Sequence, residues 1–130
     1  MLLKTVLIVD DDDSVLELER ALVEDAGYRV LTASNGREAM ERITSCQSRP
    51  ADGEPTGDGS RVDLCLLDIM MPLNDGMTVA REARRSGARF PIVYVTALPA
   101  DSARDDIADA YVGKPFDPDY LLATIRRCIG

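Results

Sequence analysis

The sequence predicts an α/β domain: a doubly wound, five-stranded parallel sheet with helices on both of its faces. Short apolar runs of strand length alternate with segments whose apolar residues recur at helical spacing. One of these runs, Val62–Leu67, is apolar except for Asp63, as expected for a strand that is covered on both faces. Strict alternation of strands and helices favours parallel strands joined by right-handed crossovers.

The N-terminal part of the chain is expected to hold two strands and two helices. In chain order these are strand Thr5–Val9, helix Ser14–Ala26, strand Tyr28–Thr32 and helix Gly36–Thr44. Gly27 follows the first helix and is a typical helix stop. Apolar residues at helical spacing are expected to face the core. They are Val15, Leu18, Leu22 and Ala26 in the first helix, and Ala39, Met40 and Ile43 in the second.

The C-terminal part is expected to hold three strands and three helices. In chain order these are strand Val62–Leu67, helix Met77–Ser86, strand Phe90–Val95, a short polar helix Asp101–Ala110, strand Tyr111–Val112 and helix Pro118–Ile129. The last helix has an inner face of Leu121, Leu122, Ile125 and Ile129. Ser45–Arg61 is polar and rich in Gly and Pro, which indicates a surface loop. We expect a tolerated insertion without function there, and a partner-binding insert is the alternative.

Length and charge limit the classes of function. A chain of 130 residues predicts one domain over residues 1–130. The net charge of −8 argues against nucleic-acid binding by this domain, because phosphate neutralisation needs clustered Lys and Arg. The pairs Arg84-Arg85 and Arg126-Arg127 fit the last turns of helices instead. No apolar run could span a bilayer and no signal peptide is evident, so we expect a cytoplasmic protein without membrane contact.

Residue types that are rare or absent restrict the chemistry. The chain has no histidine, which excludes a Ser-His triad, a His metal ligand and an internal phosphohistidine. Cys46, Cys65 and Cys128 are far apart and match neither zinc nor redox spacing. Any metal site must therefore use oxygen ligands, which points to Mg²⁺, Mn²⁺ or Ca²⁺.

Four consecutive carboxylates, Asp10 to Asp13, follow the first strand. Neighbouring carboxylates repel one another, so a cation or protons must offset their charge. Asp12 or Asp13 fits the N-terminus of the following helix, where acidic side chains cap free N–H groups. Asp10 and Asp11 are the first residues after the strand, and for them we favour a divalent cation site.

Polar residues also follow three further strands. Asp68 ends the third strand, Thr96 the fourth, and Lys114 follows the fifth. In a doubly wound sheet the carboxyl ends of the strands meet at the ligand-binding edge. Carboxylates with a cation, a hydroxyl and an ammonium group are suited to phosphoryl transfer onto a carboxylate. Each residue alone also has a structural explanation: an Asx-turn for Asp68, a cap for Thr96 and a solvated surface position for Lys114.

Together these segments resemble the motifs of response-regulator receiver domains, in family order and over essentially the whole chain. The segments are Val9-Asp10-Asp11, Leu67-Asp68-Ile69-Met70-Met71-Pro72, Val95-Thr96-Ala97 and Gly113-Lys114-Pro115-Phe116-Asp117. The resemblance implies a flavodoxin-like sheet of order 2-1-3-4-5. It also implies a two-component or phosphorelay signalling protein that takes a phosphoryl group from a partner phosphohistidine, rather than a turnover enzyme.

The resemblance assigns a role to each site residue. Asp68 is the phosphoacceptor, Asp11 binds Mg²⁺ (or Mn²⁺) directly, and Asp10 assists. Met70 offers its backbone carbonyl to the metal. Thr96 bonds the phosphoryl group, Lys114 pairs with it, and a cis peptide bond precedes Pro115. Tyr111 matches the aromatic switch position, with a plain strand-end tyrosine as the alternative. The implied partners are a histidine kinase or histidine phosphotransfer protein and an unknown downstream protein, met through a changed interaction surface.

Two other readings compete with this one. Between Thr96 and Lys114 the chain looks about one helical turn shorter than a typical receiver, with Ile107 where a glycine is usual. This predicts a shortened fourth helix and leaves open a receiver that docks a partner without switching. Asp11-Asp12-Asp13-Ser14-Val15 also matches the DxDx[TV] signature of haloacid-dehalogenase-type phosphatases. That reading leaves the Asp68–Pro72 motif unexplained.

Overall fold

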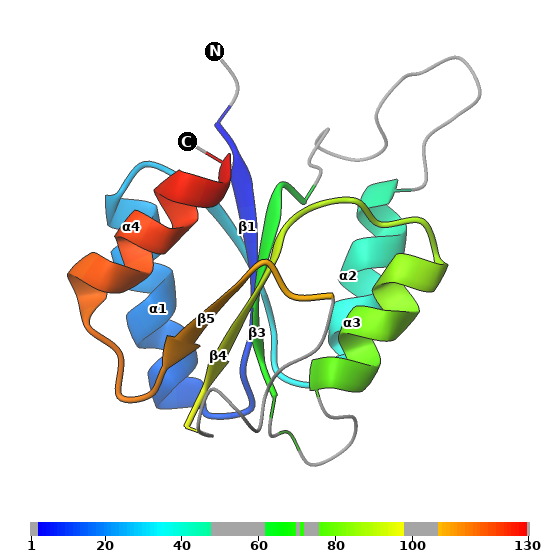
Figure 1. Cartoon of the computed structure of the whole chain (residues 1–130), viewed down its shortest axis with the longest axis horizontal. Coiled ribbons are helices and arrows are strands. Elements are labelled where there is room, and N and C mark those ends of the chain that lie inside the picture. Colours follow the sequence, from blue (N-terminus) through cyan, green and yellow to red (C-terminus); the bar gives the residue numbers. More distant parts are fainter. Residues whose placement is uncertain (1–2, 48–61, 70, 72–75, 98–106, 130) are drawn as a thin grey trace.

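A parallel sheet of five strands runs through the middle of the molecule, in the order β2-β1-β3-β4-β5 (Figure 1). The computed structural model describes residues 3–47, 62–69, 71, 76–97 and 107–129. The strands are β1 (Thr5–Val9), β2 (Arg29–Ala33), β3 (Leu64–Asp68), β4 (Ile92–Thr96) and β5 (Ala110–Gly113). The helices are α1 (Asp13–Asp25), α2 (Gly36–Gln47), α3 (Gly76–Arg85) and α4 (Pro118–Ile129). The doubly wound fold, with its strand order, is confirmed.

Successive residues of the central strands face opposite sides of the sheet, and this alternation builds two cores. In β1, Leu7 and Val9 belong to the core under α2 and α3, whereas Val6 and Ile8 belong to the core under α1 and α4. The same division holds in β3 and β4. α1 and α4 cover one face of the sheet and α2 and α3 cover the other (Figure 1). The central strands are buried on both faces, as their continuous apolar runs predict.

The inner face of α1 differs from the predicted one. Its buried residues are Leu16, Glu19 and Val23, whereas Leu18 is 52% exposed. The prediction placed Leu18 inward and left out Leu16, because its apolar spacing could not include a glutamate in the core. Leu22 and Ala26, which were also predicted to face inward, do pack partly against this core. Leu16, Glu19 and Val23 are themselves spaced by three and four residues, so the helix is amphipathic with one acidic residue on its apolar face.

The inner faces of the other two assigned helices are confirmed. In α2, Ala39 and Ile43 are buried and Met40 packs partly against the core. In α4, Leu121 and Ile125 are fully buried, with Leu122 and Ile129 packed beside them.

Several element boundaries also differ from the predictions. α2 continues to Gln47, so the predicted loop begins three residues too early, and residues 48–61 lie outside the described part of the chain. The predicted helix over 101–110 is not helical at Ile107–Asp109, and Ala110 belongs to β5. The rest of that predicted short helix, residues 101–106, also lies outside the described residues.

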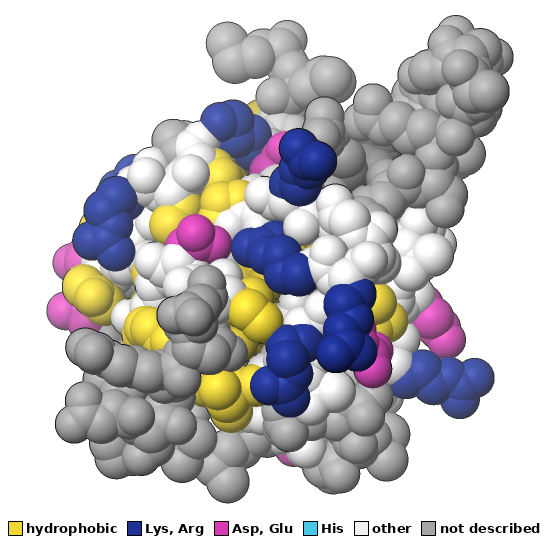
Figure 2. All heavy atoms as spheres, turned by 45° about the vertical axis from the view of Figure 1, so that its right-hand side comes forward, with side chains coloured by type: hydrophobic (Ala, Val, Ile, Leu, Met, Phe, Trp, Pro, Cys, Tyr) yellow, Lys and Arg dark blue, Asp and Glu magenta, His cyan; other side chains and the backbone are white. Residues whose placement is uncertain are grey.

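The two arginine pairs of this acidic domain lie at the C-terminal ends of helices. Arg84 and Arg85 occupy the last turn of α3, and Arg126 and Arg127 that of α4, where positive charge interacts favourably with the helix dipole. On the face shown in Figure 2, Lys and Arg side chains are more prominent than Asp and Glu.

Among the described residues, no helix is both long enough and apolar enough to cross a membrane.

Candidate functional site

Four predicted site residues lie at one edge of the sheet, because each ends or follows a parallel strand. Asp68 is the last residue of β3 and Thr96 the last of β4. Asp10 follows β1 directly, and its backbone N–H still donates to the carbonyl of Ala33 at 3.1 Å. Lys114 follows β5, and its N–H donates to the carbonyl of Thr96 at 2.8 Å. The sheet itself therefore brings together residues that are up to 104 positions apart in sequence.

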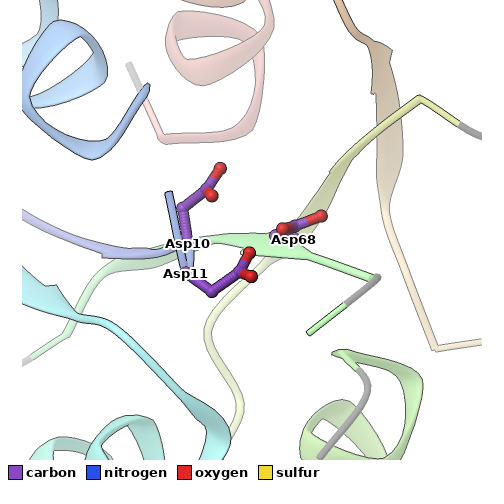
Figure 3. Close-up of side chains that lie close together, drawn as sticks. All are labelled: Asp10, Asp11 and Asp68. Carbon is purple, nitrogen blue, oxygen red and sulfur yellow. The ribbon is translucent and has the colours of Figure 1, made fainter. Parts of the chain in front are cut away.

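Three carboxylates form a cluster at this edge. One oxygen from each of Asp10, Asp11 and Asp68 lies within 4.8 Å of the other two. In Figure 3 the carboxylate of Asp11 points toward Asp68, and that of Asp10 points toward the side of α1 and α4. Opposite ligands in an octahedral Mg²⁺ sphere are about 4.2 Å apart. Small side-chain rotations would therefore bring these oxygens around a single ion, so the donor set fits a hard divalent cation.

Within this cluster, Asp10 forms a tight ion pair with Lys114. The Lys114 Nζ donates to Asp10 Oδ2 at 2.7 Å and lies 3.5 Å from Asp68 Oδ2. Asp10 is 1% exposed, and the side chain of Lys114 is 19% exposed. Burial by itself lowers the pKa of Lys114, but the hydrogen bond and charge of Asp10, with the charges of Asp68 and Glu19, outweigh it and raise that pKa. Lys114 is therefore a firmly charged ammonium group beside the carboxylates.

The acidic run after β1 divides into two structural roles. Asp12 is the N-cap of α1, and its Oδ1 accepts from the backbone N–H groups of Ser14 at 2.9 Å and Val15 at 3.3 Å. Asp13 lies in the first turn of the helix, where negative charge is favourable. The backbone N–H of Asp12 donates to Asp10 Oδ1 at 2.9 Å. This N–H group orients the carboxylate of Asp10, whereas Asp11 is exposed.

Thr96 and Tyr111 lie on the side of the sheet opposite Asp10. Thr96 is 2% exposed, and Tyr111 is half-buried on β5. The ring of Tyr111 packs edge-on against that of Tyr94, with centroids 5.6 Å apart and an interplanar angle of 64°. The peptide bond between Lys114 and Pro115 is cis, as the resemblance implies. Met70 lies outside the described residues, so its carbonyl role stays a prediction.

Two residues near the site were missed by the sequence reading. A Cβ built at Gly76, the first residue of α3, would clash with the carbonyl oxygen of Asp68 and lie 2.9 Å from the Cα of Ile69. The Gly76 N–H also donates to the carbonyl of Ile69 at 2.8 Å. α3 therefore packs directly on the backbone of the candidate phosphoacceptor. The other missed residue is Glu19, whose charge acts on Lys114; helical spacing from Leu16 and Val23 was the available signal.

Comparison with known families identifies the protein class. Residues 6–126 match the model of the response regulator receiver domain. This chain belongs to that family. Receiver domains are signalling domains of two-component systems, and the resemblance inferred from the motifs is confirmed.

Sequence relatives are response regulators. The chain is 38% identical to response regulator MprA of Mycolicibacterium vanbaalenii over 95% of its length and 49% of the relative. It is 33% identical to the alkaline phosphatase synthesis transcriptional regulatory protein PhoP of Bacillus subtilis, over 97% of the chain and 48% of the relative. The receiver chain thus spans about half the length of these curated relatives.

Solved structures share its fold. Chemotaxis protein CheY4 of Vibrio cholerae aligns with a TM-score of 0.82 at 27% identity, covering 98% of this chain and 100% of that one. Response regulator protein TrrA of Thermotoga maritima, in complex with Mg²⁺-BeF, aligns with a TM-score of 0.80 at 31% identity. That alignment covers 98% of the receiver and 100% of TrrA.

Proposed function

We propose that this receiver accepts a phosphoryl group on Asp68 from a phosphohistidine of a partner protein, in a reaction that needs Mg²⁺. The observation that carries the proposal is the cluster of Asp10, Asp11 and Asp68 oxygens within 4.8 Å, with the ammonium of Lys114 beside it. If the pair of Asp10 and Lys114 served only to stabilise the fold, the exposed carboxylate of Asp11 would not be needed beside it. The complex of the related TrrA with Mg²⁺-BeF supports the proposal, because that protein shares the fold and binds the same cation.

Each residue has a defined part in the proposed reaction. A bound Mg²⁺, held by Asp11 and Asp68 with help from Asp10 and the Met70 carbonyl, would offset negative charge on the phosphoryl oxygens. An oxygen of Asp68 attacks phosphorus. The P–O bond forms as the P–N bond to the donor imidazole breaks, and the bonding electrons stay with that nitrogen. Lys114 and the Thr96 hydroxyl then bind the equatorial oxygens.

The phosphoryl group changes the charge balance at the sheet edge. It adds a charge of about −1.5 to −2 and three acceptor oxygens. Lys114 is 3.5 Å from Asp68 in the present state and pairs more closely with Asp10. We expect it to turn toward the phosphoryl group, with Thr96 drawn in from β4 and Tyr111 following on β5. This movement would shift a two-state equilibrium and alter a protein-binding surface.

The partners follow from this chemistry. The donor is a histidine kinase or a histidine phosphotransfer protein, since the chain itself has no histidine. PhoP of Bacillus subtilis is a transcriptional regulatory protein, and the chain matches about half of its length. We infer that control of transcription is one class of output open to this receiver. Any DNA contact would then belong to another part of such a regulator, since the receiver carries a net charge of −8.

Chemical phosphorylation tests the proposal. The purified chain is incubated with acetyl phosphate, with and without Mg²⁺, and its intact mass is measured. We expect one added phosphoryl group in the presence of Mg²⁺, lost in Asp68→Asn and after chelation of the metal. Asp13→Asn is the matched control, because Asp13 is exposed in the first turn of α1 and should retain full labelling. Labelling that survives in Asp68→Asn would reject the phosphoacceptor assignment.

The same variants separate the competing functions. A haloacid-dehalogenase-type phosphatase would use Asp11 as nucleophile and Asp13 as its acid, so Asp13→Asn would lose activity and phosphate esters would turn over steadily. A receiver that only docks a partner would change its amide NMR spectrum on phosphorylation only at residues next to Asp68, and Tyr111 would keep its signal. We expect stoichiometric labelling without turnover, and spectral changes at Thr96 and Tyr111.

A further inference from the structure

Glu19 is a carboxylic acid placed in the hydrophobic core. It is 1% exposed, in the middle of α1, between the buried Leu16 and Val23. Its Oε1 has no hydrogen-bond partner in the described part of the chain. A buried carboxyl without a donor is costly when ionised, and this cost favours its neutral, protonated form. The stability of the fold gives no reason for such a residue, since an apolar side chain would suit the position better.

The position of Glu19 points to the metal cluster. Residues 6 and 8 of β1 and residues 64 and 66 of β3 face the layer of α1 and α4. By the same alternation Asp10 and Asp68 face this layer, and in Figure 3 the carboxylate of Asp10 points toward it. α1 is the helix that packs over this end of the sheet beside α4 (Figure 1). The buried acid and the candidate metal ligands therefore lie on one side of the sheet.

The charged groups acting on Glu19 are those of the site. The pKa of Glu19 is raised to about 8, and burial is the largest cause of this rise. The charges of Asp10 at the end of β1 and Asp68 at the end of β3 contribute to the rise, whereas Lys114 opposes it. From α4 the buried neighbours of this core, Leu121 and Ile125, are uncharged. No hydrogen bond of the described residues joins Glu19 to Asp10 or Asp68, so the coupling acts through space.

We propose that Glu19 couples cation binding at the Asp10–Asp11–Asp68 cluster to the release of one proton from the core, so that Mg²⁺ affinity rises with pH across the neutral range. The inference rests on the proposed Mg²⁺ site. A divalent cation offsets two of the three negative charges of the cluster, so that Glu19 experiences less repulsion from it. Ionised Glu19 then becomes more favourable, and by linkage its ionisation strengthens cation binding. Glu19 thus acts through the cluster and does not ligate the ion.

The composition of the chain makes the released proton measurable. With no histidine, no side chain titrates near neutral pH at its ordinary pKa. Lys114, whose positive charge acts on Glu19, has a raised pKa and keeps its proton throughout this range. If the ion lowers the pKa of Glu19 by one unit from about 8, about half a proton should leave per bound ion at pH 7.5. The Mg²⁺ affinity should rise up to about tenfold between pH 6 and pH 9.

Two measurements on the whole chain test the inference. MgCl₂ is added to weakly buffered protein at pH 7.5 and the released protons are counted with a pH electrode. Mg²⁺ affinity is measured between pH 6 and pH 9 by titrating amide NMR shifts. Both are done on the native chain, on Glu19→Gln and on Glu24→Gln, an exposed acid on the same helix. We expect proton release and pH-dependent affinity in the native chain and Glu24→Gln, and neither in Glu19→Gln.

The outcomes distinguish this inference from the proposed function. Mg²⁺ binding and Asp68 labelling with equal proton release in the native chain and Glu19→Gln would overturn the role of Glu19 alone. Absence of Mg²⁺-induced shifts at every pH, in all variants, would overturn the metal site and this coupling with it. Should Glu19→Gln fold poorly, Glu19→Met provides the second neutral variant, and pH-dependent binding that persists in it would also refute the coupling.

Discussion

Asp10 at the end of β1 and Glu19 in the middle of α1 are equally buried carboxylic acids with opposite surroundings. Each is 1% exposed. Asp10 accepts from the backbone N–H of Asp12 at one oxygen and from the ammonium of Lys114 at the other. Glu19 leaves Oε1 without a donor in the described part of the chain. The comparison shows that burial alone does not decide how an acid behaves, because the donors at each oxygen determine whether its charge is tolerated.

The largest expected effect is the pH dependence of stability that Glu19 causes. In the unfolded chain its pKa is near 4.5, and in the folded chain it is about 8. Between these values only the folded chain holds the proton, so stability falls as pH rises and levels off above pH 8. From pH 5.5 to pH 8 the free energy of unfolding should fall by about 3 kcal/mol more in the native chain than in Glu19→Gln. Urea unfolding without Mg²⁺ at each pH measures this fall. An equal fall of the free energy of unfolding with pH in the native chain and in Glu19→Gln would contradict the raised pKa of Glu19.

Removal of the Lys114 ammonium should leave one oxygen of the buried Asp10 without its donor, as one oxygen of Glu19 is. Breaking a buried ion pair from one side costs about 3–5 kcal/mol when both partners are fully buried. Since the Lys114 side chain is 19% exposed, we expect Lys114→Met to lower the free energy of unfolding by about 2 kcal/mol at pH 7. Adding Asp10→Asn to this variant should recover much of the loss. Equal stability of the native chain and Lys114→Met would mean that the pair contributes nothing to the fold.

The third buried carboxylate, Asp68, is positioned by packing rather than by a cap. A methyl group at Gly76 would collide with backbone atoms of Asp68 and Ile69. We expect Gly76→Ala to cost about 1.5 kcal/mol of stability, as overpacking does, and to slow acetyl phosphate labelling. Gly113→Ala is the matched control, because a Cβ there meets nothing within 4 Å. Equal unfolding midpoints and labelling rates for the two variants would contradict the close approach.

The smallest effect concerns the helix cap that orients Asp10. Asp12→Ala removes the acceptor of two N–H groups at the start of α1, and N-cap losses cost about 1 kcal/mol. Asp13→Ala, one residue later in the first turn, should cost less because Asp13 acts on the helix dipole alone. Thermal unfolding of the two variants measures the difference. A larger loss for Asp13→Ala would reassign the cap.

The strands and the site were predictable from sequence because both depend on short-range patterns. A strand buried on both faces has a continuous apolar run, and a parallel sheet must gather the residues that follow such runs at one edge. Asp10, Asp68 and Lys114 meet for this reason. Their roles in phosphoryl transfer came from the family motifs and stay predictions.

The missed features depend on three-dimensional contacts. Glu19 reads as a surface residue by type, and only the packing of α1 on the sheet buries it. Gly76 reads as a loop glycine, and only the approach of α3 to β3 shows what a side chain would meet. Helix ends such as Gln47 depend on the last turns, where local propensity is weak.

The alternation of side chains across the sheet has a mechanical consequence for signalling. Acceptance of phosphate would take place on the layer of α1 and α4, whereas Thr96 and the edge-on pair of Tyr94 and Tyr111 face the opposite layer. At this edge the N–H of Lys114 donates to the carbonyl of Thr96 at 2.8 Å, which joins the residue after β5 to the end of β4. A pull on the ammonium side chain is thereby transmitted through one peptide unit to the strand on which the hydroxyl is carried. The carboxyl ends of β4 and β5 would then couple a change on the side of α1 and α4 to a change on the side of α2 and α3.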